Sequence, residues 1–581
     1  MQKITRENIQ DYALKLMFKM KDEEFDTFEK EFETIIKQMD LIGKTEGIEK
    51  VEPMTFPFRN KDAKLRKDEA TSTLTTEDAV KNAHETIYDE VKVPKSSWRW
   101  RIMSYLDKSL EEIHAALKEG KVTSSQLTKE ALERAHASQE ELNSFVTILD
   151  DAKEEEITDN VLSGIPCAIK DNLSTKGVLT TASSNILADY VPVFDATCIE
   201  KLKASGAVMM GKTVMDELGM GGTGTTGHTG VVRNPWDITR QTAGSSAGSA
   251  AAVAKGIVPY ALGTDTGDSI RKPAGYCGVV GYKPTYGLVS RWGLFAFASS
   301  MDHVGCFTRK VKDVAYVIDA IKGIDERDMT SIDSSNINLV DSYTTDVKGK
   351  KLFYIKELNE ELKNTPEFYD NFMKSIEYAK ECGMEVEEES IDENILRSLY
   401  PSYMAISCAE ATSNNSNLTG IPFGNRKEGH TPAEVMINTR TEGFSELIRR
   451  RFVLGSFILQ KENQEKLFKN AQRIRRLIVD KMNELFKKYD GCIMPNTNTI
   501  APHFGETSDV MSDNYLLFAE NMVISNFGGF PSISIPSGMV EGMPVAINIS
   551  GPIKTDSTVI NMAAALEEKI GFVPLNVREE K

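Results

Sequence analysis

Short apolar runs alternate with helical segments along most of this chain, from about Ser104 to the C-terminus. A segment from Leu106 to Glu119 has helical spacing of its apolar residues. The alternation predicts an α/β fold in which a largely buried sheet is covered by helices. The runs that we expect to be strands are 166–170, 207–211, 249–255, 351–355, 491–495, 532–536 and 545–549.

The first part of the chain differs from this pattern. Apolar stripes with helical spacing run through residues 9–20 and 25–42, and a charged stretch without periodicity follows at 51–69. Two short helices bury too little surface to make a comfortable domain alone. We therefore predict that residues 1–97 form a small helical hairpin with an extended arm, which packs on and wraps a larger domain of residues 98–581.

Composition limits the classes of function. A chain of 581 residues with net charge −17 exceeds one ordinary core and lacks the basic excess of a strong nucleic-acid binder. Its seven scattered cysteines form no CxxC pair, which fits free thiols in a reducing cytosol. We find no long apolar run, signal peptide or metal-ligand spacing. We expect a cytoplasmic protein that binds no membrane, metal or cofactor, with any RNA contact local or made by a partner.

Three polar segments carry the chemistry. Lys170 ends an apolar run, Ser245 and Ser246 lie in a stretch of small residues, and Ser269 follows Gly267 in a tight turn. A serine becomes a good nucleophile when a base takes its proton, and a buried lysine can be neutral enough to do so. Backbone amides near Gly267 could form an oxyanion hole, where each donor contributes about 3 kcal/mol. Together the segments predict acyl transfer from a carboxamide, although each alone has an ordinary structural explanation.

Two other patterns point to different chemistry. Gly222–Gly227 matches the dinucleotide fingerprint G-x-G-x-x-G and comes within one residue of a P-loop. Both motifs require a helix directly afterwards, and Gly230 and Pro235 oppose one there. A Ser-His-Asp triad through His303 is conceivable, but no G-x-S-x-G elbow accompanies it. We rank both below the Ser-Ser-Lys interpretation.

The three polar segments resemble the Ser-Ser-Lys site of the amidase signature family, whose fold is a mixed β-sheet with helices on both faces. The resemblance implies that Ser269 attacks the amide carbon. It also implies that Ser245, in a cis peptide with Ser246, passes the proton to Lys170 and later returns one to the leaving ammonia. The N–H groups implied to hold the oxyanion are those of Thr266, Gly267, Asp268 and Ser269.

Further segments resemble one branch of that family. Those at 232–237, 278–291, 295–305, 327–331, 409–414 and 439–451 are similar to the A subunit of glutamyl-tRNA(Gln)/aspartyl-tRNA(Asn) amidotransferase. Residues 1–97 independently resemble the C subunit of the same enzyme. The resemblance implies a natural C–A fusion that hydrolyses glutamine. It also implies a B-type partner subunit, which would use ATP and Mg²⁺, make most tRNA contacts and choose the tRNA.

The sequence also departs from the family pattern. Ala243 and Ala247 replace glycines beside the first serines, and Asp268 replaces the second of two glycines before the nucleophile. An anion there could oppose the oxyanion, so we expect the Asp268 side chain to point outward. An inward carboxylate would need a cation or a base such as Arg271 or Lys272.

Residues for glutamine recognition are suggested at two places. In Arg449–Arg451, the resemblance favours Arg450 or Arg451 as the partner of the α-carboxylate, because a guanidinium matches a carboxylate with two parallel hydrogen bonds. The family's A-type chain commonly offers an aspartate for the α-amino group near the C-terminus. No aspartate stands at that place here, although Glu520 and Asn521 are nearby.

Three functions compete at this point. The chain could be the glutaminase component of a tRNA-dependent amidotransferase, a free-standing amidase acting on small carboxamides, or a catalytically weakened scaffold. The C-subunit resemblance favours the first function over the second. Retention of Lys170, Ser245 and Ser269 favours it over the third.

Overall fold

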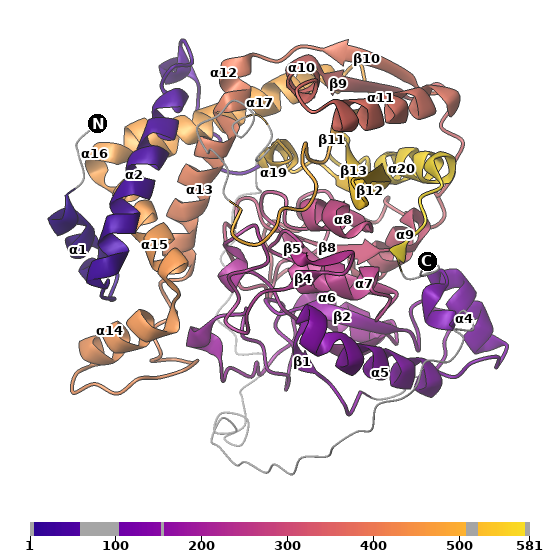
Figure 1. Cartoon of the computed structure of the whole chain (residues 1–581), viewed down its shortest axis with the longest axis horizontal. Coiled ribbons are helices and arrows are strands. Elements are labelled where there is room, and N and C mark those ends of the chain that lie inside the picture. Colours follow the sequence, from indigo (N-terminus) through magenta and orange to yellow (C-terminus); the bar gives the residue numbers. More distant parts are fainter. Residues whose placement is uncertain (1–4, 59–103, 153–155, 507–516, 518–520, 576–581) are drawn as a thin grey trace.

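The computed structural model describes residues 5–58, 104–152, 156–506, 517 and 521–575. These residues form an eleven-stranded mixed sheet and a separate two-stranded ribbon (Figure 1). The strand order in the large sheet is β1-β3-β2-β6-β8-β7-β12-β13-β11-β9-β10. Its strands are β1 (Phe145–Ile148), β2 (Pro166–Lys170), β3 (Val208–Thr213), β6 (Tyr260–Asp265), β7 (Val280–Lys283), β8 (His303–Thr308), β9 (Lys351–Ile355), β10 (Glu385–Glu389), β11 (Gly491–Pro495), β12 (Ser532–Val540) and β13 (Met543–Ser550); the ribbon is β4 (Arg233–Asn234) and β5 (Asp237–Gln241).

Helices pack along this sheet, as the alternation in the sequence predicts. For example, α7 contacts β2 and β6, α9 contacts β8, and α20 contacts β12. The helices are α1 (Arg6–Lys15), α2 (Asp22–Ile42), α4 (Leu110–Lys118), α5 (Ser124–Leu142), α6 (Thr197–Ala204), α7 (Ala247–Ala254), α8 (Arg271–Cys277), α9 (Val311–Ile321), α10 (Lys356–Leu362), α11 (Pro366–Glu381), α12 (Glu393–Arg397), α13 (Leu399–Asn414), α14 (Pro432–Gly443), α15 (Glu446–Leu459), α16 (Lys461–Gln464), α17 (Asn470–Leu485), α19 (Val523–Gly528) and α20 (Asp556–Ile570).

The centre of the sheet determines where the polar segments meet. β2 runs parallel to both β3 and β6, and Ile169 is in register with Leu262. Parallel neighbours end at the same edge of a sheet, so Lys170 at the end of β2 lies close to the turn that follows β6. That turn contains Ser269. Two segments about a hundred residues apart are thus joined by strand register.

Most predicted strands are confirmed, and one is wrong. Residues 249–255 belong to the helix α7. The error has a physical cause, because a short apolar run can be a buried helix as well as a buried strand, and alanine is the best helix former. Small residues are required here. A Cβ on Gly248 would lie 2.3 Å from the backbone oxygen of Ser144.

The predicted N-terminal hairpin is present as α1 and α2, which lie against α13, α15 and α17 (Figure 1). Their buried side chains belong to the same continuous hydrophobic cluster as the core around the sheet. The ring of Phe32 packs at 4.9 Å from that of Phe457 on α15, in a T-shaped arrangement. The hairpin therefore shares the core of the larger domain.

Polar contacts fix the same helices. Glu24 of α2 forms a buried ion pair with Arg449 of α15, and Arg440 Nε donates to the backbone oxygen of Leu16 at 2.9 Å. The arm begins at Val51 and contains neither helix nor strand as far as Phe58, and Met54 N donates to the backbone oxygen of Gln472 at 3.1 Å. The remainder of the arm and the predicted boundary at residue 97 lie outside the described residues.

Replacing Phe32 by alanine tests the shared core. A buried phenylalanine lost from a packed interface costs about 3–5 kcal/mol, and we expect the opening free energy of α2 to fall by that amount. Hydrogen exchange of the α2 amides measures it. Leu14→Ala is the control, because this side chain is 46% exposed and its removal should change little. Unaltered exchange in Phe32→Ala would contradict the packing described here.

Candidate active site

Lys170 ends β2 fully buried, and its amine meets three oxygen atoms. Lys170 Nζ lies 2.7 Å from Ser245 Oγ, 2.8 Å from Ser246 Oγ and 3.2 Å from the backbone oxygen of Thr264. The predicted contact between Lys170 and Ser245 is thus observed. The position of Ser246 as a second partner of the lysine was not predicted. The adjacency of the two serines was the available signal, but only the entry into α7 turns both hydroxyls toward the amine.

The environment makes this lysine a possible base. Burial lowers the pKa of Lys170 to about 7, although the carboxylates of Asp216, Asp265 and Asp302 each favour its charged form. At neutral pH a substantial share of the side chain therefore carries a free electron pair. An ordinary lysine, with a pKa near 10.4, would have almost none.

The hydrogen bonds select which serine gives up its proton. The hydroxyl of Ser246 donates to the backbone oxygen of Thr264 at 3.0 Å, so toward Lys170 it can only accept. The Thr264 oxygen also accepts only. When the amine is neutral, its two hydrogens satisfy these two acceptors and its electron pair faces Ser245. The geometry therefore prepares Ser245 to pass a proton to Lys170.

The predicted cis peptide lies one residue earlier than expected. The cis bond joins Gly244 to Ser245, and the Ser245–Ser246 bond is not cis. Ser246 is the N-cap residue of α7, and its N–H donates to the backbone oxygen of Ser269 at 3.2 Å. That hydrogen bond joins the two serine segments.

A buried ion pair shapes the turn that carries Ser269. Arg271 binds both carboxylate oxygens of Asp265 at 3.0 Å and donates to the backbone oxygen of Gly267 at 2.6 Å. A peptide is planar and trans, so holding the Gly267 oxygen directs the N–H of Asp268 the opposite way. Within the described chain, the N–H groups of Gly267, Asp268 and Ser269 have no acceptor. They are available to a ligand oxygen.

Asp268 does not point outward, so that expectation is wrong. Its side chain is buried, and Oδ2 lies 3.3 Å from Lys272 Nζ. Burial raises the pKa of Asp268, while the Lys272 ammonium opposes the rise. The neighbouring base that an inward carboxylate requires is therefore Lys272, one helical turn along α8.

The structure places the predicted glutamine-binding residues in different surroundings. Arg450 pairs with Glu31 at 3.1 Å and with Glu446 at 3.3 Å, so its charge is already matched within the chain. Arg451 instead points toward α13, with Nη1 3.7 Å from Met404 Sδ. Asn521 is buried, and neither its side-chain nitrogen nor its oxygen has a hydrogen-bond partner within the described residues. Glu520 lies outside the described residues.

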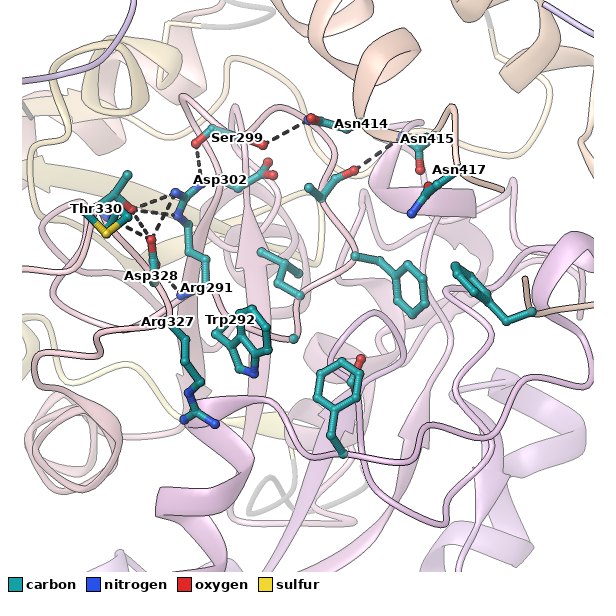
Figure 2. Close-up of a pocket in the computed structure, with 18 of the residues that line it drawn as sticks. Arg291, Trp292, Ser299, Asp302, Arg327, Asp328, Thr330, Asn414, Asn415 and Asn417 are labelled. Atoms are coloured by element: carbon teal, nitrogen blue, oxygen red, sulfur yellow. Dashed lines mark hydrogen bonds and ion pairs between the residues drawn. The ribbon is translucent and has the colours of Figure 1, made fainter. Parts of the chain in front are cut away.

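A cavity of about 570 Å³ is lined by Arg291, Trp292 and Asp302, among others (Figure 2). Its wall includes Asp302, which accepts a hydrogen bond of 2.7 Å from the hydroxyl of Thr266 in that turn. Arg291 in the same wall donates to Thr330 at 2.7 Å and faces Asp328. The cavity combines aromatic and charged side chains that sequence reasoning did not assign, since they come from loops far apart in the chain.

His303 takes no part in a triad. It is buried in β8, its Nδ1 lies 2.6 Å from the backbone oxygen of Met301, and its Nε2 lies 3.3 Å from Lys283 Nζ. In the part of the chain that the structure describes, no three His, Cys, Asp or Glu side chains form a group able to hold a metal ion. No described helix has the length and apolar character needed to cross a bilayer.

Comparison with known proteins assigns this arrangement to a family. The profile of the Amidase family matches residues 126–560. The chain belongs to the amidase family. A second profile, that of the Glu-tRNAGln amidotransferase C subunit, matches residues 20–93. The predicted union of a C-like segment with an amidase domain is thereby confirmed.

Individual relatives agree with this assignment. The A subunit of glutamyl-tRNA(Gln) amidotransferase from Latilactobacillus sakei is 40% identical over 482 residues, which cover 81% of this chain and 98% of the relative. Its counterpart from Streptococcus pneumoniae is 39% identical over 485 residues, with 81% and 98% covered. The crystal structure of the corresponding protein from Thermotoga maritima superposes with a TM-score of 0.68 at 35% identity, covering 80% of this chain and 96% of that one. The predicted amidase signature fold is confirmed.

The pKa of Lys170 predicts a pH dependence. The lysine accepts a proton only when neutral, so kcat/KM for amide hydrolysis should rise with pH through about 7 and then level off. A pH profile between about 5.5 and 9 measures this limb. Lys170→Arg is the control, because a guanidinium stays charged throughout and should leave the enzyme inactive at every pH. A flat profile in the parent enzyme would contradict a lysine base.

Proposed function

We propose that this chain is the glutaminase component of a tRNA-dependent amidotransferase, which converts Glu-tRNA(Gln) to Gln-tRNA(Gln) with glutamine and ATP. The observation that carries the proposal is the buried contact of Lys170 with Ser245, next to the Ser269 turn, in a chain that also contains a C-subunit-like segment. The A-type relatives, named for glutamyl-tRNA(Gln) amidotransferase, support this choice of substrate.

The proposed chemistry begins at Ser269. Its hydroxyl oxygen attacks the side-chain amide carbon of glutamine, its proton moves to Ser245, and the proton of Ser245 moves to Lys170. The developing oxyanion accepts hydrogen bonds from the N–H groups of Gly267, Asp268 and Ser269, with Thr266 at the start of the turn.

Collapse of the tetrahedral intermediate breaks the carbon–nitrogen bond. Lys170 returns a proton through Ser245 to the leaving nitrogen, which departs as ammonia, and a glutamyl ester remains on Ser269. Water then attacks the ester with the same proton relay and releases glutamate. The bound Asp268–Lys272 pair places no unpaired anion beside the oxyanion.

Arg450, Arg451 and Asn521 are our candidates for glutamine recognition. Arg450 binds Glu31 and Glu446, and Arg451 contacts Met404 on α13, so both arginines have partners within the chain and both stay candidates for the α-carboxylate. A buried amide without partners costs about 1–3 kcal/mol, which favours a ligand at Asn521. The next residue, Met522, accepts a hydrogen bond from Arg271 at 2.8 Å, so Asn521 adjoins the nucleophile network. Glu520 stays a candidate for the α-ammonium group.

The remaining components belong to a partner. We assign ATP, Mg²⁺ and most tRNA contacts to a B-type subunit, because the chain carries net charge −17 and no motif for phosphate transfer. We place the protein in the cytoplasm. In the alternative of a free-standing amidase, the N-terminal segment would serve as an oligomerisation device, and its match to the C subunit of the amidotransferase favours the first function instead.

Reconstitution with a B-type subunit tests the proposal. The complex should form Gln-tRNA(Gln) from Glu-tRNA(Gln) with ATP and either glutamine or ammonium chloride. With Ser269→Ala, glutamine should fail and ammonium should still work, because only ammonia production is lost. Failure of the chain to bind a B-type subunit, combined with rapid hydrolysis of small amides, would favour the free-standing amidase.

The catalytic three should behave as one unit. Ser269→Ala should abolish glutamine hydrolysis, and Ser245→Ala and Lys170→Ala should each lower kcat at least about a thousandfold. Combining Ser245→Ala with Lys170→Ala should cost little more than either change alone. Near-normal turnover of Lys170→Ala would refute the assignment.

Alanine in place of whichever of Arg450 and Arg451 binds the α-carboxylate should raise the KM for glutamine at least about tenfold, because its bidentate partner is lost. Alanine at the other position, on the same helix, is the matched control and should leave KM within about twofold. Steady-state kinetics with glutamine measures both. Equal, small effects would instead indicate that both arginines only support α15.

A further inference from the structure

The glycine-rich loop Gly222–Gly227, which matches a nucleotide-binding motif by spacing, binds a carboxylate of the chain itself. The N–H groups of residues 222–226 all donate to Asp216: three to Oδ2 at 2.8–3.1 Å and two to Oδ1 at 3.1 and 3.2 Å. The hydroxyl of Thr226 adds a bond of 2.9 Å. Consecutive backbone N–H groups that converge in this way form an anion-binding nest. Asp216 occupies the place that a phosphate would take.

The same residue holds the segment of the candidate proton relay. The N–H of Asp216 donates to the backbone oxygen of Ser245 at 3.1 Å. A Cβ on Gly244 would lie only 1.9 Å from Asp216 Oδ2, and one on Gly221 would lie 2.4 Å from its Cγ. Asp216 is thus packed directly against the backbone that presents Ser245 to Lys170.

The charge of Asp216 also reaches Lys170. Three carboxylates face this lysine: Asp216 after β3, Asp265 at the end of β6, and Asp302 before β8, and Asp216 favours the charged lysine most. Asp265 is paired with Arg271, and Asp302 lies near Arg291 and is held by hydrogen bonds. In the described chain, no Lys, Arg or His side chain lies within ion-pair distance of Asp216. Its charge is held by hydrogen-bond donors alone.

We propose that Asp216 is a positioning residue, which presents Ser245 to Lys170 and places a negative charge beside the lysine, with loop 222–227 as its receptor. The proposal rests on the assignment of Lys170, Ser245 and Ser269 made above. It explains the glycines of the loop, because Gly222 and Gly224 have φ of +107° and +76°, a region that favours glycine. It also explains the many donors around one side chain, since a buried carboxylate is costly unless it is hydrogen-bonded.

Asp216→Asn is the direct test. The amide keeps the shape of the side chain, but its NH₂ group replaces one carboxylate oxygen and cannot accept hydrogen bonds from the backbone N–H groups that bind that oxygen in the parent protein. With the full chain, kcat for glutamine and for propionamide should fall at least about tenfold, with KM within about twofold. The acid limb of kcat/KM should move to lower pH by about half a unit or more, because removing the anion lowers the pKa of Lys170.

A matched control separates this effect from loss of stability. Asp556 is also a buried carboxylate and accepts hydrogen bonds from Tyr282 and Thr285, but the lysine that its charge favours is Lys283. Asp556→Asn should lower the melting temperature without moving the acid limb. A shift of the limb in both variants, or in neither, would overturn the proposal.

A milder change covers the case in which Asp216→Asn does not fold. Thr226→Val keeps the side-chain shape but removes the hydroxyl that donates to Asp216 and accepts from the Glu217 N–H. It should lower kcat several-fold, whereas Thr226→Ser should restore it. Unchanged kcat in Thr226→Val would overturn the positioning role. Ser269→Ala is assayed in parallel on both substrates. If it stays active, the catalytic assignment has failed, and that outcome is distinct from a failure of Asp216.

Discussion

Burial of one amine at the end of a central strand governs the arrangement of this site. Lys170 is enclosed by the parallel strands on either side of β2, and its nitrogen contacts three oxygen atoms. Burial makes the charged form costly, so the lysine can be neutral near pH 7. The Ser245–Ser246 segment must then enter α7 with both hydroxyls facing the amine. Two glycines flank the segment closely packed, because a Cβ on Gly244 would meet Asp216 and one on Gly248 would meet the backbone of Ser144.

Charge around this amine is distributed through separate groups, each with its own partners. Asp265 is paired with Arg271, Asp302 accepts a hydrogen bond from Thr266, and Asp216 is held by backbone donors. Each of these anions therefore has partners other than Lys170. A buried pair costs desolvation energy, and its benefit here is geometric, since the Arg271 guanidinium also orients the Gly267 peptide.

The N-terminal helices connect to this centre through ordinary contacts. Glu24 binds Arg449 on α15, and Ser445, which caps α15, donates its N–H to Glu217 at 3.2 Å. Glu217 follows Asp216 in the chain, and its own N–H donates to Thr226 at 3.1 Å. The C-like segment thus contacts α15, and the start of α15 contacts Glu217 beside the loop around Asp216. The two parts of the chain are joined by these contacts as well as by the covalent fusion.

The sequence alone determined the family of this protein and much of its fold. Lys170, Ser245 and Ser269 could be proposed because they supply a base, a relay and a nucleophile, and because their segments resemble the Ser-Ser-Lys site of the amidase family. The strands could be placed because apolar periodicity is a local property. Residues 249–255 were misjudged because a short apolar run fits a helix as well as a strand. The outward Asp268 was misjudged too, and the choice between Arg450 and Arg451 stays open. Both of these depend on which neighbour a side chain meets. Only the tertiary structure decides such contacts, because they join segments that strand register and helix packing bring together from distant parts of the chain. The same holds for loop 222–227, whose spacing suggests an anion but cannot show that the anion is Asp216.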